Sequence, residues 1–87
     1  MIARYEVKGH SMEPTYLEGD RLLLWKTKNV KKGDVIVFSR NNMDLVKRIT
    51  AIDGHKIMAE GDNRNCNGLH TAETEINRII GKVIMKY

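Results

Sequence analysis

The stretch DLVKRITAIDGHKIMAE, residues 44–60, is the clearest structural signal in this chain because it has the pattern of a β-hairpin. Two runs that suit β-strands, 44–52 and 56–60, flank the dipeptide Asp53-Gly54. An Asp-Gly pair readily adopts the positive φ angles that a tight hairpin turn needs. The stretch therefore predicts two antiparallel strands joined by a short turn.

Four more short strands are expected around this hairpin. The first alternates apolar and polar side chains with the period of two of a half-buried strand, and two others are each introduced by a Gly-Asp pair that suits a turn. The expected strands outside the hairpin are residues 3–8, 21–26, 34–39 and 78–87, and residues 71–77 are expected to form a helical turn. About six short strands with almost no helix predict an all-β fold, either a small sheet that folds over on itself or a partly open barrel.

The length of the chain limits it to one small domain, residues 1–87. Its 87 residues are 41% apolar and 30% charged, which suits a globular core and excludes a multidomain enzyme. A chain of this size buries only about 60 to 65% of the surface that it exposes when unfolded. We therefore expect any functional site to be a groove near the surface.

The charge balance favours anionic partners only weakly. The chain carries 15 basic and 11 acidic residues, for a formal net charge of +4. Its densest basic run, Lys26–Lys32, lacks the interleaved aromatic residues and the continuity that are typical of a nucleic-acid surface. A solvated basic loop is the favoured interpretation, and a basic nucleic-acid-binding barrel remains an alternative.

Cysteine content and hydropathy exclude further classes of protein. A single cysteine, Cys66, cannot form an intrachain disulfide, and the spacing of Cys and His predicts neither a metal site nor a cofactor. The apolar runs are far shorter than the roughly 18 to 20 residues that span a bilayer, and residues 1–8 lack a signal-peptide core. We expect no transmembrane segment and a cytoplasmic or peripherally membrane-associated protein, with a membrane-anchoring partner left open.

The segment GHSMEPT, residues 9–15, places a serine in a constrained turn. Gly9 permits a sharp change of direction after the first strand, and Pro14 restrains the backbone on the other side of Ser11. A serine held in this way can serve as a nucleophile or simply as a turn residue. His10, beside it, is expected to be exposed or to flank a groove.

Lys47 lies in the middle of the first strand of the hairpin. Strict alternation would place it on one face with three apolar residues, Leu45, Ile49 and Ala51. Such neighbours would lower the pKa of its ammonium group, because burial penalises the charged form, and the neutral amine could then act as a base. In the alternative interpretation, the aliphatic stem packs on the sheet and the ammonium reaches water at its edge. A serine paired with a lysine is a known nucleophile and base combination.

Several motifs together resemble those of type I signal peptidases. They occur in the order and approximate spacing of that family: GHSMEPT at 9–15, LEGD at 17–20, GDVIVF at 33–38, VKRI at 46–49, GDNR at 61–64 and IGKV at 80–83. More distantly, the chain is similar to the protease domain of LexA-like repressors. The resemblance covers nearly the whole chain.

The resemblance implies a serine endopeptidase that cleaves a peptide or protein substrate through an acyl-enzyme, without a metal or cofactor. Ser11 would be the nucleophile and its backbone N–H an oxyanion donor, and Lys47 would be the general base. The substrate would lie as an extended strand in a groove that prefers small side chains just before the cut. The residues implied to support the site are Gly9, Met12, Pro14, Asp62, Asn63, Arg64 and Asn67.

The chain departs from the family pattern in several respects, which include the absence of the usual Asp-Ser-Arg segment after GDNR and differences at two single positions. Some relatives carry a hydroxyl residue two positions before the nucleophile, where this chain has Gly9. Close relatives also carry a serine that supports the lysine, and here Asn67 is the expected substitute. A catalytically silent peptide-binding or regulatory β-domain of the LexA-like type therefore remains an alternative to the peptidase.

Overall fold

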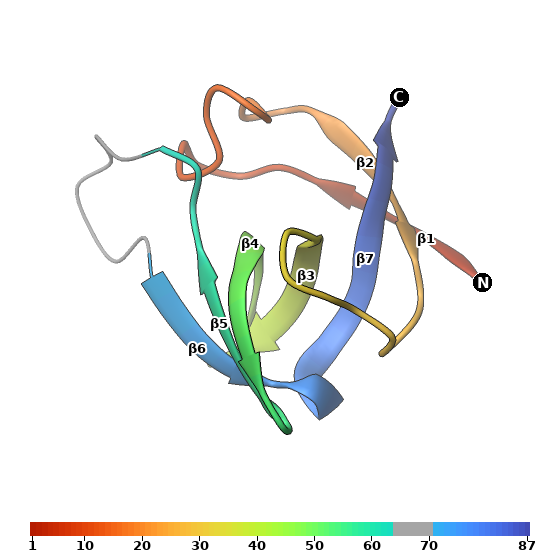
Figure 1. The fold of residues 1–87 in the computed structure, drawn as a ribbon. Helices are drawn as coiled ribbons and strands as arrows, with labels where there is room; N and C mark the ends of the chain where they lie inside the picture. The colour runs from red at the N-terminus through yellow and green to blue at the C-terminus, as the bar shows by residue number, and fades with distance from the viewer. Residues whose placement is uncertain (64–70) are drawn as a thin grey trace.

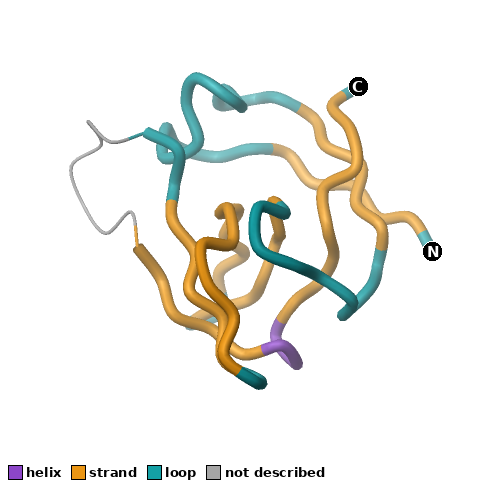
Figure 2. Tube along the Cα trace, in the orientation of Figure 1, coloured by secondary structure: helices purple, strands orange, loops and turns teal. Residues whose placement is uncertain are grey.

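The computed structural model describes residues 1–63 and 71–87, which contain seven β-strands and one short 3-10 helix (Figure 1). The elements are β1 (Ile2–Glu6), β2 (Arg21–Trp25), β3 (Val35–Arg40), β4 (Met43–Asp53), β5 (Lys56–Glu60), β6 (Thr71–Glu75), η1 (Ile76–Arg78) and β7 (Ile79–Lys86). Figure 2 shows how little of the trace is helical, so the prediction of an all-β fold is confirmed. Within these ranges, no helix has the length and apolar character of a membrane span.

All seven strands belong to one antiparallel sheet with the order β1-β2-β7-β3-β4-β5-β6. The sheet curves strongly, so that the segment after β5 meets the segment after β1 (Figure 1). At this meeting point the Asn63 N–H donates a hydrogen bond to the Ser11 carbonyl oxygen, with an N···O distance of 2.8 Å. The sheet is open but folded over on itself, as the strand pattern predicts.

Two tight turns place β4 between β3 and β5. The predicted hairpin is present, and its turn consists of Gly54 and His55, with a φ of 61° at Gly54. Asn41 and Asn42 form a second two-residue turn between β3 and β4, with φ angles of 52° and 64°. Positive φ at both Asn41 and Asn42 is the geometry that matches the twist of the flanking strands. The hairpin turn lies one residue later than the predicted Asp53-Gly54 pair, because Asp53 still pairs with Lys56 as the last residue of β4.

The prediction of a helical turn over residues 71–77 is wrong for most of that range. Residues 71–75 form β6, which pairs with β5, and helical backbone begins only at Ile76. Ala72 and Thr74 are each 5% exposed and face the core, whereas the residues between and beside them face solvent. Pairing with β5 and burial of this alternating face outweigh the weak local helical tendency of the segment.

A register shift between Ile49 and Ala51 changes which β4 side chains share a face. Ile49 pairs with Ala59 of β5. Ala51 pairs with Met58, so the residue between the two pairs is an extra one, as in a β-bulge. Ala59 and Met58 are consecutive in β5, so their side chains point to opposite faces of the sheet. Because paired residues of neighbouring strands share a face, Ile49 and Ala51 also lie on opposite faces. The prediction that Ala51 shares a face with Lys47 is therefore wrong.

Apolar side chains on both faces of the sheet are buried, because the sheet folds over. The first cluster contains Val7, Met12, Leu22, Leu24, Val35, Val37 and Val46. The second cluster contains Ile36, Phe38, Ile49, Ile57, Ala59, Ala72 and Ile79. Successive residues of β3 alternate between the two clusters, and β4 also contributes to both, with Val46 in the first and Ile49 in the second.

Candidate active site

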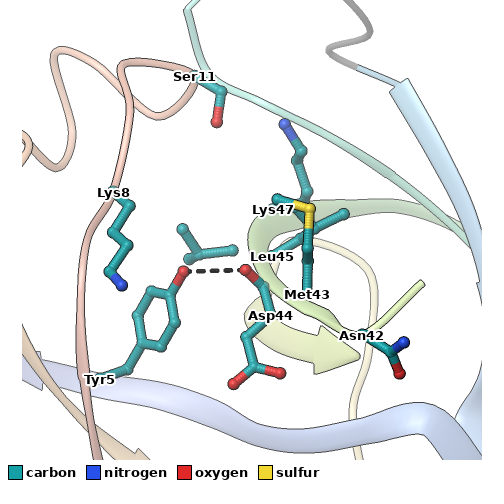
Figure 3. A pocket seen from close by; sticks show the side chains of 9 residues that line it. Tyr5, Lys8, Ser11, Asn42, Met43, Asp44, Leu45 and Lys47 are labelled. Carbon is teal, nitrogen blue, oxygen red and sulfur yellow. Dashed lines mark hydrogen bonds between the residues drawn. The ribbon is translucent and has the colours of Figure 1, made fainter. Parts of the chain in front are cut away.

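A groove of about 350 Å³ lies between the segment that leaves β1 and the first half of β4 (Figure 3). Tyr5, Lys8 and Ser11 line one side of it, and residues 42–47 line the other. Ser11 and Lys47 are far apart in the sequence, but the folded sheet brings both to this groove. Figure 3 shows the Ser11 hydroxyl and the Lys47 amino group at the same end of it.

Lys47 is held on an apolar face of β4 and is only 5% exposed. It pairs with Ile36 of β3, which belongs to the second cluster. Its two neighbours on the same face of β4, Leu45 and Ile49, also pack in or against that cluster. The alternative in which the ammonium extends freely into water at the sheet edge does not match this burial.

Ser11 is partly buried in a compact turn that follows β1. The Glu13 N–H donates to the His10 carbonyl oxygen at 3.2 Å, and the Tyr16 N–H donates to the Met12 carbonyl oxygen at 3.0 Å. The Met12 side chain is 1% exposed and packs in the first cluster. Met12 thus anchors the serine turn to the core.

Gly9 and Pro14 bound the serine turn on its two sides. Gly9 has a φ of 79°, a conformation that glycine adopts without the strain that a Cβ would cause. Its N–H donates to the Glu18 carboxylate at 3.0 Å, which ties the start of the turn to the chain beyond it. Pro14 follows a cis peptide bond.

The segment after β5 contacts the backbone of the serine turn directly. The Asn63 side-chain amide donates to the His10 carbonyl oxygen at 2.9 Å, in addition to the backbone bond from Asn63 to Ser11. Gly61 lies so close to this turn that a Cβ at its position would collide with the Ser11 carbonyl oxygen. The tight approach of the two segments therefore requires glycine at this point.

Asp62 connects the serine turn to β4. One carboxylate oxygen accepts from Arg48 Nε at 3.0 Å, and the other accepts from Arg48 Nη2 at 3.0 Å and from the Thr15 hydroxyl at 2.6 Å. These hydrogen bonds, led by the one from Arg48, hold the pKa of Asp62 below its usual range, although partial burial opposes the shift. The charged form of Asp62 is the form that this network stabilises.

His10 lies next to Ser11 in the sequence but pairs with Glu13. The two side chains are 2.5 Å apart at Nδ1 and Oε2, and the His10 side chain is 62% exposed. The bond to Glu13, followed by the charges of Glu13 and Glu18, raises the pKa of His10. Within the described parts of the chain, no group of three or more His, Cys, Asp or Glu side chains is placed to hold a metal ion.

Sequence reasoning missed three residues of this arrangement and named two that lie outside the described residues. The three missed residues are Gly61, Thr15 and Arg48, and each lies in one of the family motifs of the sequence. The motifs could therefore have pointed to them, but a motif does not indicate which of its residues contact one another in the fold. Arg64 and Asn67, which the resemblance assigns to the site, fall in the range that the structure does not describe.

Comparison with known proteins shows which family the chain resembles. The family model described as signal peptidase, peptidase S26, matches residues 1–84. Signal peptidase IB of Staphylococcus aureus (strain Mu50 / ATCC 700699) is 35% identical over 82 residues, which cover 88% of this chain and 43% of that protein. Signal peptidase I of Bacillus licheniformis is 32% identical over 75 residues, which cover 79% of this chain and 40% of that protein.

This chain spans less than half the length of these two relatives. The family match nevertheless extends over almost all of the chain, from the first strand to the last. It includes the serine turn, the groove strand β4 and the segment after β5. The chain therefore belongs to the signal peptidase family, peptidase S26.

Proposed function

We propose that this chain is the catalytic core of a serine endopeptidase that cleaves an extended peptide with a Ser11–Lys47 dyad. The observation that carries the proposal is that these two residues line one groove, with the lysine almost completely buried. Membership of a peptidase family supports the same class of reaction.

In the proposed reaction, neutral Lys47 accepts the hydroxyl proton of Ser11 while Ser11 Oγ attacks the scissile carbonyl carbon. The Ser11 N–H stabilises the oxyanion, a type of contribution worth about 3 to 4 kcal/mol per donor in comparable enzymes. Lys47 then delivers the proton to the leaving amine, and the acyl-enzyme remains. Water, deprotonated by Lys47, attacks the ester carbonyl, and the proton returns to Ser11 as the carboxylic acid leaves.

The proposed substrate enters as an extended strand along β4. This strand pairs with β3 over residues 43–48, but its pairing with β5 begins only at Arg48. One backbone edge of residues 43–47 therefore has no strand partner among the described residues, and these residues line the groove. A peptide strand can add to such an edge through main-chain hydrogen bonds. The residues before the cut would occupy this edge, with small side chains favoured next to Ser11.

The nucleic-acid alternative loses part of its basis in the structure. Lys28 of the basic run is engaged within the fold, since its ammonium donates to the carbonyl oxygens of Asn77 at 3.1 Å and Ile79 at 2.5 Å. The silent peptide-binding alternative uses the same groove and strand edge as the peptidase. Only the chemistry of Ser11 and Lys47 separates these two functions.

Removal of either dyad side chain tests the proposal. Ser11→Ala and Lys47→Met are each expected to lower the kcat/KM for a signal-peptide cleavage-site peptide by about 10⁴-fold or more, because residues that act as a unit fail together. Cleavage would be measured by mass spectrometry of the products, with folding checked by circular dichroism. Ser39→Ala and Lys56→Met, which change residues outside the groove, are the matched controls and should retain activity.

Two results would count against the dyad in different ways. Cleavage at the wild-type rate by either dyad variant would remove that residue from the mechanism. Specific peptide binding by the wild-type chain without any cleavage would favour the silent binding domain.

A further inference from the structure

Tyr5 and Asp44 form a hydrogen bond across the groove. The Tyr5 hydroxyl donates to the backbone carbonyl oxygen of Asp44, with an O···O distance of 3.2 Å (Figure 3). Tyr5 belongs to β1 and Asp44 to β4, and these strands are not neighbours in the sheet. The bond therefore links the two sides of the groove away from Ser11.

The directions of the backbone groups along β4 show to which edge of the strand the Asp44 carbonyl points. The Ile49 N–H donates to Asp34 at 2.8 Å and the Ile49 carbonyl accepts from Gly33 at 2.9 Å, so both groups point toward the β3 side. In an antiparallel strand, the N–H and C=O of one residue point to the same edge, and successive residues alternate between edges. Val46 and Asp44 therefore direct their backbone groups to the open edge, where a substrate strand would pair.

We propose that Tyr5 is a specificity-determining residue that limits how far a substrate strand pairs with β4. The inference rests on the function proposed above. The Tyr5 hydroxyl already occupies one of the two lone pairs of the Asp44 carbonyl from the groove side. A peptide N–H that reaches this carbonyl must compete with the hydroxyl or share the oxygen with it, so it gains less than it would at a free carbonyl. Among the described residues, no side chain forms a hydrogen bond of this kind with the backbone N–H or C=O of Val46, which lies nearer to Lys47. Substrate recognition by backbone pairing is thus confined to the residues next to the cut.

The surroundings of Tyr5 suit its role as a cap, by which we mean a side chain whose hydroxyl occupies the Asp44 carbonyl. The Tyr5 ring is half-buried and packs against the first cluster, so little side-chain freedom is lost when the bond forms. Burial, followed by the nearby charge of Asp44, raises the pKa of the Tyr5 hydroxyl. The hydroxyl therefore keeps its proton at neutral pH and remains a donor.

The test is a length series of peptides that bind without being cleaved. Cleavage-site peptides extended one residue at a time before the cut would be titrated into the Ser11→Ala variant and into the same variant carrying Tyr5→Phe. With Tyr5 present, the affinity should stop improving once the peptide has paired with Val46. With Phe at position 5, the next residue should tighten binding by about two- to tenfold, the equivalent of one net hydrogen bond.

An ester scan of the peptide adds a sharper readout. In one peptide, an ester replaces the amide whose N–H would donate to the Asp44 carbonyl. This replacement should leave the affinity for the protein with Tyr5 unchanged and should abolish the increase in affinity seen with Tyr5→Phe. Tyr87→Phe removes a phenolic hydroxyl outside the groove and is the matched control, for which the length series should follow that of the parent protein.

The outcomes separate this inference from the proposed function. Identical length series with and without the Tyr5 hydroxyl, in a chain that cleaves peptide, would overturn the cap and leave the peptidase standing. A cap-dependent length series in a chain that cleaves nothing would support the cap and contradict the peptidase. If no peptide binds at all, both proposals are wrong.

Discussion

Asp62 joins the two sides of the candidate site through hydrogen bonds. Its carboxylate bonds to Arg48, the residue that follows Lys47 in β4, and to Thr15, which belongs to the same turn as Ser11. A change at Asp62 would thus act on both sides of the groove through residues one to four positions away from the dyad. Charge-assisted bonds of this kind are stronger and more directional than neutral ones.

We predict that the contribution of Asp62 to stability depends on pH. Because its folded pKa lies below the unfolded value of 3.8, the stabilisation is fully present above that value and is lost as pH falls through the folded pKa. Urea unfolding of wild type and Asp62→Asn should differ by about 1 kcal/mol at neutral pH, a modest figure because the Arg48 side chain is 38% exposed and solvent screens the pair. The difference should shrink toward pH 2.

Arg48→Gln provides the control for this prediction. Without the guanidinium, the main cause of the lowered pKa is gone, so Asp62→Asn should have a smaller effect that varies less with pH. If the difference in the free energy of unfolding between wild type and Asp62→Asn grew as the pH fell, the predicted pH dependence would be wrong.

At the scale of the element, β6 shows how pairing and burial define a strand that has little local signal. Its inward residues, Ala72 and Thr74, lie on the side of the second cluster, and Thr74 pairs with the fully buried Ile57 of β5. The Thr74 hydroxyl is buried and has no hydrogen-bond partner among the described residues. An unsatisfied buried hydroxyl costs free energy, so β6 forms despite this group.

We predict that Thr74→Val stabilises the chain. Valine has nearly the same shape and favours a strand equally well, and its methyl group carries no desolvation penalty in the core. The expected gain is about 1 kcal/mol in the free energy of unfolding, measured by urea denaturation. Thr71→Val, on the exposed face of the same strand, should change stability by less than about 0.5 kcal/mol. A loss of stability in Thr74→Val would mean that the hydroxyl has a partner.

At the scale of the whole molecule, the curved sheet makes two apolar clusters share strands β3 and β4. Val35 and Val37 of β3 belong to the first cluster, whereas Ile36 and Phe38 belong to the second. The serine turn is anchored in the first cluster, and Lys47 lies on the face of the second. The β4 side of the groove contacts both clusters, because Val46 belongs to the first and Leu45 packs against the second. The two clusters therefore cannot separate without breaking β3 and β4.

We predict that the chain unfolds as one cooperative unit. Val37→Ala in the first cluster should lower the free energy of unfolding by about 2 kcal/mol, and Ile36→Val in the second by about 1 kcal/mol. Trp25 fluorescence and far-ultraviolet circular dichroism should report the same midpoint in each variant. Separate midpoints for the two probes would show that the clusters unfold independently.

The strand pattern and the turns of most of the chain could be predicted from sequence because they depend on neighbouring residues. The β-hairpin is an example, since Gly54 and the flanking runs lie within one short stretch, although the turn itself is Gly54–His55 instead of Asp53-Gly54. The strand at 71–75 and the bulge near Thr50 could not be predicted, because each depends on pairing with β5. The register between two strands is a property of both, and one strand's alternation does not report it.

For the candidate site, the local patterns around Ser11 and Lys47 left a structural role open for each residue, and it was the set of motifs in register that proposed them as a pair. The same motifs identify the family. The folded sheet was needed to bring these residues to one groove, to put Asp62 between Arg48 and Thr15, and to place the Tyr5 hydroxyl on the Asp44 carbonyl. Each of these contacts joins segments that are distant along the chain. Their geometry follows from the curvature of the sheet and the packing of its two clusters, which no local stretch of sequence encodes.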